Sequence, residues 1–89
     1  MSNRNDRNRL KNLKRIQKLL GNDFHINSDR GGFAAYRFNP NNKDEAIYVH
    51  LRPMGTEWII SSPELGIDWR GTPLRVGVNR VLATCLLVV

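Results

Sequence analysis

Residues 3–20 combine a helical repeat of apolar residues with a separate line of cations, and this combination restricts what the rest of the chain can be. Leu, Lys, Arg and Gln favour helix, no Gly or Pro interrupts the segment, and Gly21 with Asn22 ends it. The apolar residues fall in one half of the helical wheel: Leu10, Leu13, Ile16, Leu19 and Leu20. Such a stripe must pack against an apolar surface, so the remaining residues must provide one.

The middle of the chain has the alternation and the turn residues of β-strands. Strand-like runs occupy residues 33–39, 46–52 and 56–62, with breaks at "PNNKDE" and "PMG" between them. A shorter extended piece at 24–27 precedes the Gly31-Gly32 break. This pattern predicts an antiparallel meander of three to four strands.

A second helix is predicted from about residue 73 to 87. Thr72 and Pro73 have the residue types of an N-cap and a first-turn proline. Apolar residues then recur at helical spacing: Leu74, Val78, Val81, Leu82, Cys85, Leu86 and Val89. Gly77 and the β-branched valines weaken helix propensity, so residues 86–89 are expected to be either the helix end or an extended segment.

The order of elements predicts a two-layer α+β fold, with both helices packed on one face of the sheet, in a single domain of residues 1–89. Period-two alternation places eight residues on the covered face: Ala34, Tyr36, Phe38, Ile47, Val49, Leu51, Trp58 and Ile60. It places seven on the opposite face: Phe33, Arg37, Tyr48, His50, Arg52, Glu57 and Ile59.

The net positive charge of the chain comes from its first helix. Residues 1–20 hold seven Lys and Arg against one Asp, whereas residues 21–89 hold seven cations and seven anions. Six of these cations share a sector of the wheel opposite the apolar stripe: Arg4, Arg7, Lys11, Lys14, Arg15 and Lys18. At 1.5 Å per residue they form a line about 21 Å long, which matches several consecutive phosphates.

This cationic line favours nucleic acid as the partner, with RNA slightly ahead of DNA because no groove-reading motif is present. In composition the segment resembles the arginine-rich RNA-binding peptides of phage antiterminators and lentiviral regulators, which implies phosphate contacts along one helix. The order helix, three strands, helix is also that of double-stranded-RNA-binding domains, but those carry their cations at the last helix. Two other interpretations stay open: an acidic partner protein and a simply solvated helix face.

A second candidate surface is the uncovered face of the sheet. Arg37, Tyr48, His50 and Arg52 are expected to lie there on neighbouring strands. Aromatic and cationic side chains on a strand surface can stack bases and pair with phosphates.

The remaining residues predict no catalytic site, cofactor or metal. One cysteine and two separate histidines, His25 and His50, form no ligand set, and no nucleophile has an ordered partner. "SDRGG" at 28–32 is expected to be a turn. The longest apolar run, residues 81–89, is about half of what a membrane span needs, and no signal peptide is recognisable, so we expect a cytoplasmic protein without a membrane role. The apolar "LLVV" at the end is a possible dimer or partner contact.

Overall fold

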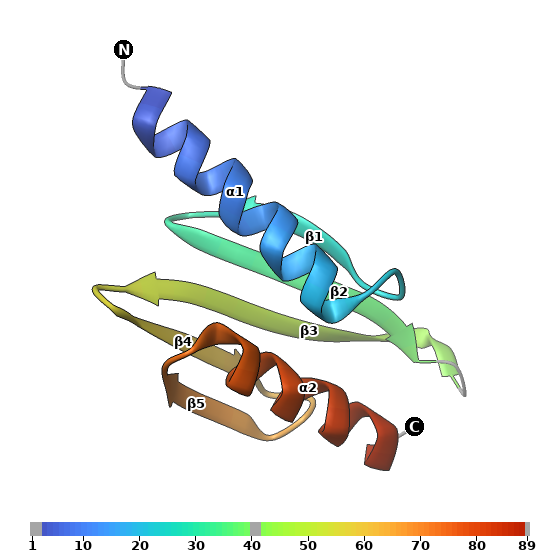
Figure 1. The fold of residues 1–89 in the computed structure, drawn as a ribbon. Helices are drawn as coiled ribbons and strands as arrows, with labels where there is room; N and C mark the ends of the chain where they lie inside the picture. Colours follow the sequence, from blue (N-terminus) through green and yellow to red (C-terminus); the bar gives the residue numbers. More distant parts are fainter. Residues whose placement is uncertain (1–2, 40–41, 89) are drawn as a thin grey trace.

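The computed structural model describes residues 3–39 and 42–88; the side chains of residues 3–6, 43, 87 and 88 lie outside that description. Its elements are α1 (Asn3–Leu20), β1 (His25–Asp29), β2 (Gly32–Asn39), β3 (Asn42–Met54), β4 (Glu57–Ser62), β5 (Ile67–Gly71) and α2 (Leu74–Val88). The strands form one antiparallel sheet in the order β1-β2-β3-β4-β5, and both helices lie on the same face of it (Figure 1). The predicted two-layer α+β class is confirmed.

The sheet has one strand more than the sequence indicated. β5 follows the turn at residues 63–66 and pairs with β4, Ile67 opposite Ser62 and Trp69 opposite Ile60. Its five residues contain only two large apolar side chains and end at Gly71, which is too short a pattern to separate from a loop. β3 also begins earlier than predicted, at Asn42, because the β2–β3 hairpin is long.

β3 and β4 supply the centre of the core as predicted. Val49, Leu51 and Ile60 are fully buried, and the ring centroid of Trp58 lies 6.3 Å from that of Phe33. Ser62 is buried too, but its hydroxyl donates to the Tyr48 carbonyl at 2.6 Å and accepts from the Leu65 amide at 3.3 Å. The hydroxyl therefore satisfies backbone groups where the β3–β4 pairing ends.

The face predicted for β2 was wrong. Phe33 and Ala35 are buried under the helices, whereas Ala34, Tyr36 and Phe38 lie on the opposite face. The pairing decides this, because Phe33 lies opposite Leu51 and Ala35 opposite Val49. β2 carries apolar residues on both sides, so its own alternation does not identify the buried side.

The two helices cover different parts of the sheet. Ile16 and Leu20 anchor α1, which packs against β1 and against α2 (Figure 1). α2 covers β4 and β5, and four of its described side chains are buried: Leu74, Val78, Val81 and Cys85. A Cβ atom at Gly77 would lie 2.5 Å from Ile60 Cδ1 and 2.5 Å from a Trp69 ring carbon, so the glycine allows α2 to approach the sheet closely. The residue that weakened the predicted helix is thus required by its packing.

Candidate functional site

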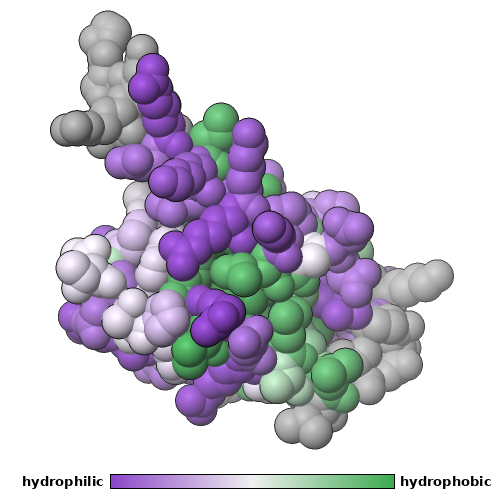
Figure 2. All heavy atoms as spheres, viewed as in Figure 1, coloured by the Kyte–Doolittle hydropathy of each residue, from purple (hydrophilic) through white to green (hydrophobic). Residues whose placement is uncertain are grey.

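The outward side of α1 carries a row of exposed cations, called here the α1 cation row. Its members among the described side chains are Arg7, Lys11, Lys14, Arg15 and Lys18. They are exposed because Ile16 and Leu20, on the other side of the same helix, are held in the core. Figure 2 shows hydrophilic atoms gathered along this helix and on its N-terminal half, which projects past the sheet (Figure 1). The sixth predicted member, Arg4, lies outside the described side chains.

No member of the α1 cation row forms an ion pair with a described carboxylate. The ion pairs among the described side chains join Arg37 to Asp23 at 4.0 Å and Arg70 to Glu57 at 3.0 Å. The row is therefore a line of positive charge without compensation from these residues, about 17 Å long between Arg7 and Lys18 at 1.5 Å per residue. Neighbouring cations three and four residues apart repel one another, so a bound anion would lower the energy of this helix.

Local hydrogen bonds hold the end of α1 against the sheet. Gly21 ends the helix with a positive φ of 91°, and its amide donates to the Gln17 carbonyl at 2.9 Å. The Gln17 side-chain amide donates to the carbonyls of Gly21 and Phe24, at 2.8 and 3.1 Å. These contacts fix the direction of α1 relative to β1, and with it the direction of the α1 cation row.

A groove of about 700 Å³ runs between α1 and the edge strand β1. Leu10, Leu13 and Ile26 form its apolar lining, and Lys14 and Lys18 belong to its cationic rim. Leu10 is 51% exposed, because the apolar stripe of α1 extends beyond the part of the helix that the sheet covers. This groove places apolar surface directly beside the cations, which suits a protein partner better than a phosphate chain.

The sheet face opposite the helices, called here the open face, carries a row of rings. His25, Tyr36 and Tyr48 lie opposite one another on β1, β2 and β3, with ring centroids 5.2 Å apart for His25 and Tyr36 and 5.9 Å apart for Tyr36 and Tyr48. Phe38 contacts Tyr36 edge-on at 6.2 Å. Tyr48 was predicted on this face, as observed, whereas the other three rings were not, because only the pairing register brings them together.

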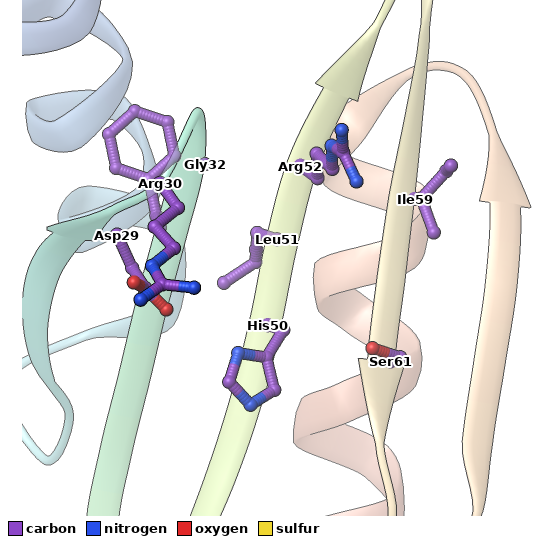
Figure 3. Close-up of a pocket in the computed structure, with 9 residues that line it drawn as sticks. Asp29, Arg30, Gly32, His50, Leu51, Arg52, Ile59 and Ser61 are labelled. Carbon is purple, nitrogen blue, oxygen red and sulfur yellow. The ribbon is translucent and has the colours of Figure 1, made fainter.

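Further along the open face is a hollow of about 290 Å³. His50, Arg52 and Ser61 line it from β3 and β4, Asp29 lines it from the end of β1, and Arg30 lines it from the β1–β2 turn (Figure 3). Gly32 borders this hollow, and a Cβ there would lie 2.8 Å from the Leu51 carbonyl oxygen, so the glycine allows β2 to approach β3 closely. His50 and Arg52 thus share the open face with Tyr48, as predicted.

Arg37 does not lie on the open face, and its predicted placement was wrong. It lies opposite Ile47 and is directed to the covered side, where its guanidinium carbon is 5.7 Å from the Phe24 ring centroid. Its side chain is 19% exposed, and its buried Nε has no hydrogen-bond partner. Because the two faces of β2 are the reverse of those predicted, Arg37 lies on the covered side and has the surroundings of a core residue.

A scan against protein-family models, a search of curated proteins and a search of solved structures each gave no match. The geometry of the site therefore carries the functional argument.

The described residues contain neither a metal site nor a membrane-spanning helix. No three His, Cys, Asp or Glu side chains among residues 7–39 and 42–86 are grouped to hold an ion. Over the part of the chain that is described, neither helix combines the length and the apolar character needed to cross a bilayer. Cys85 is buried in α2, and burial raises the pKa of its thiol while the positive charge of Arg37 opposes that shift.

The two predicted surfaces do not form one site. The α1 cation row lies on the outer side of the helical layer, whereas Tyr48, His50 and Arg52 lie on the other side of the sheet. A single extended ligand would have to pass around the β1 edge to contact both.

Proposed function

We propose that this chain is a non-enzymatic protein that binds nucleic acid through the α1 cation row. The observation that carries the proposal is the exposure of all five described cations of the row, none of them paired with a described carboxylate. Arginine and lysine neutralise phosphates and release condensed counterions, so the row supplies affinity for a phosphate backbone of any sequence. Arg4 is predicted to extend the contact.

The C-terminal half of the helix is held in place before any ligand arrives, which favours binding. Because Ile16 and Leu20 are packed in the core, the cations beside them, Lys14, Arg15 and Lys18, need no folding step to line up, and the entropy cost of ordering them is small. We place RNA ahead of DNA, since the described elements include no groove-reading motif, and we place the protein in the cytoplasm.

A salt titration tests the proposal. If about five phosphates are neutralised, the logarithm of the association constant falls against the logarithm of the salt concentration with a slope of about 4 to 5 on a duplex. Affinity then drops about 500-fold between 50 and 200 mM NaCl. Filter binding with a labelled RNA hairpin and a DNA duplex measures this slope, and no retention of either at 50 mM would contradict the proposal.

A matched pair of variants locates the contact. Lys14→Gln/Lys18→Gln removes two charges from the α1 cation row, and Arg75→Gln/Arg80→Gln removes two exposed charges from α2. We expect the first variant to lower the salt slope by about 2 and the second to leave it unchanged. Equal losses from both variants would mean that net charge, not the row, attracts the nucleic acid.

The groove favours one second candidate, a regulatory or inhibitory protein that docks α1 on an acidic partner. Leu10→Gln separates the two functions, because Leu10 is an exposed apolar member of the groove and has no charge to give to a phosphate. Under the leading proposal the nucleic-acid affinity of Leu10→Gln stays within about twofold of the affinity of the unsubstituted protein. Capture of a partner that survives nuclease treatment and is lost in Leu10→Gln would support the second candidate instead.

A further inference from the structure

The second half of β2 reverses the polarity that a strand with one solvated face normally has. In an antiparallel sheet with helices on one side, alternation usually places apolar residues inward and polar residues outward. β2 instead directs Arg37 towards the helices and Tyr36 and Phe38 away from them. Sequence patterns that break such a rule are expected at functional surfaces.

The outward rings form one continuous patch, called here the aromatic patch: His25, Tyr36, Phe38 and Tyr48. Phe38 is 56% exposed and Tyr48 is 47% exposed, although both are large apolar side chains. Aromatic residues are enriched in protein interfaces, where a few of them carry most of the binding energy. Covering the patch with another apolar surface would therefore lower the free energy of the protein.

The charges of the open face indicate what covers the patch. The described charges on or beside the open face are three arginines and five carboxylates, and one pair of them already forms an ion pair: Arg30, Arg52 and Arg70 with Asp29, Asp44, Glu57, Glu64 and Asp68. This face has no excess positive charge for a phosphate chain, and because it carries charges of both signs, arginines of one copy can pair with carboxylates of an identical face. The α1 cation row is on the other side of the sheet, so two copies that join by their open faces keep their cationic helices apart.

The size of the open face also fits a second copy. Five strands about 4.8 Å apart and about 20 Å long give a surface of about 24 by 20 Å, so two copies bury on the order of 1,000 Å². This is at the lower limit of specific interfaces between proteins. Two sheets can pack face to face at about 10 Å with their side chains interleaved.

We propose that the open face binds a second copy of this chain, forming a twofold dimer in which the two aromatic patches lie in the interface and the helices face outward. Because a twofold interface uses the same surface on both copies, each ring contributes twice. The dimer would present two α1 cation rows on opposite outer sides.

Sedimentation equilibrium of the full chain from about 1 to 500 µM tests the proposal. We expect an average mass that rises from 10.2 kDa towards twice that value as concentration increases. Tyr48→Glu should weaken the dimer at least 30-fold, since it places two buried charges in the interface. Val76→Glu is the matched control, because Val76 is also 47% exposed but lies on α2, and it should leave the dissociation constant unchanged.

Circular dichroism and thermal unfolding show whether each variant is folded, and Phe38→Ser provides a second, uncharged test of the same patch. A wild-type protein that is monomeric at 500 µM overturns the proposal. So does a dimer that Tyr48→Glu and Phe38→Ser leave intact, or one that Val76→Glu weakens equally. A monomer whose Tyr48→Glu variant loses affinity for single-stranded RNA would assign the open face to base stacking and would also overturn it.

Discussion

Gly77 is the residue at which α2 comes closest to the sheet. Alanine has the higher helix propensity by about 1 kcal/mol, but its Cβ would overlap Ile60 and the Trp69 ring. Overpacking of this kind costs about 1 to 3 kcal/mol, so we expect Gly77→Ala to lower the free energy of unfolding.

Urea unfolding checks this expectation against Ala83→Gly, an exposed position of the same helix. That control should also destabilise, by about 1 kcal/mol, because glycine loses more backbone entropy than alanine when the helix forms, and at this exposed position packing adds nothing. If Gly77→Ala were more stable than the unsubstituted protein, the close approach of α2 to β4 and β5 would be disproved.

Cys85 makes the stability of the fold depend on pH in the alkaline range. Burial raises the pKa of its thiol, so the folded state holds the proton more tightly than the unfolded state does. The resulting stabilisation is complete below the unfolded pKa of about 8.5 and is lost as the pH rises through the folded pKa.

We therefore expect the difference in unfolding free energy between the unsubstituted protein and Cys85→Ala to shrink as the pH is raised above about 8.5. Parallel urea titrations from pH 7 to 10.5 measure this difference, and other alkaline groups cancel because both proteins contain them. A difference that is constant over this range would mean that the thiol stays protonated or is not buried.

At the scale of elements, the helices were predictable and the faces of the strands were only partly so. Residues 3–20 carry five helical repeats of local pattern, and the structure has α1 over the same residues. The α1 cation row follows from that pattern alone, since helical spacing determines which side chains share a side. The open face depends on which strands pair and in what register, and that information is not local.

β2 shows why. Its segment "FAAYRF" offers an apolar set on either side, and only the pairing of Phe33 with Leu51 selects the buried one. Arg37 then lies on the covered side, although a charged residue would ordinarily be assigned to solvent. The aromatic patch could be found from the sequence only by testing both registers of β2 against β3.

The α1 cation row should be dispensable for folding. Its members repel one another at three- and four-residue spacing by about 0.2 to 0.5 kcal/mol per pair. We expect the fourfold change of Lys11, Lys14, Arg15 and Lys18 to Gln to leave the unfolding free energy unchanged or raise it by up to about 1 kcal/mol, while nucleic-acid binding is lost.

Ile16→Ala is the control on the buried side of the same helix, and it should cost about 2 to 5 kcal/mol. Thermal and urea unfolding of both variants test the contrast. If the fourfold Gln variant lost more than about 2 kcal/mol, the cations would be part of the fold and their availability to a ligand would be refuted.

At the scale of the whole molecule, charge and apolar surface are separated by the thickness of the sheet. The α1 cation row lies outside the helical layer, and the open face with its aromatic patch lies on the other side. The two surfaces therefore depend on different forces. Release of counterions is sensitive to salt, whereas burial of apolar rings is not weakened by it.

This separation predicts that the two associations respond differently to the same change of salt. Between 50 and 200 mM NaCl we expect the affinity for nucleic acid to fall about 500-fold, while the dimer dissociation constant changes by less than about threefold. Sedimentation and filter binding in matched buffers measure both constants. A dimer that dissociated in parallel with the loss of nucleic acid would mean that the nucleic acid, and not the open face, holds the two copies together. Retention of the dimer at 200 mM NaCl after nuclease treatment would exclude that bridge, because apolar contact is the force that persists when phosphate contacts have been screened.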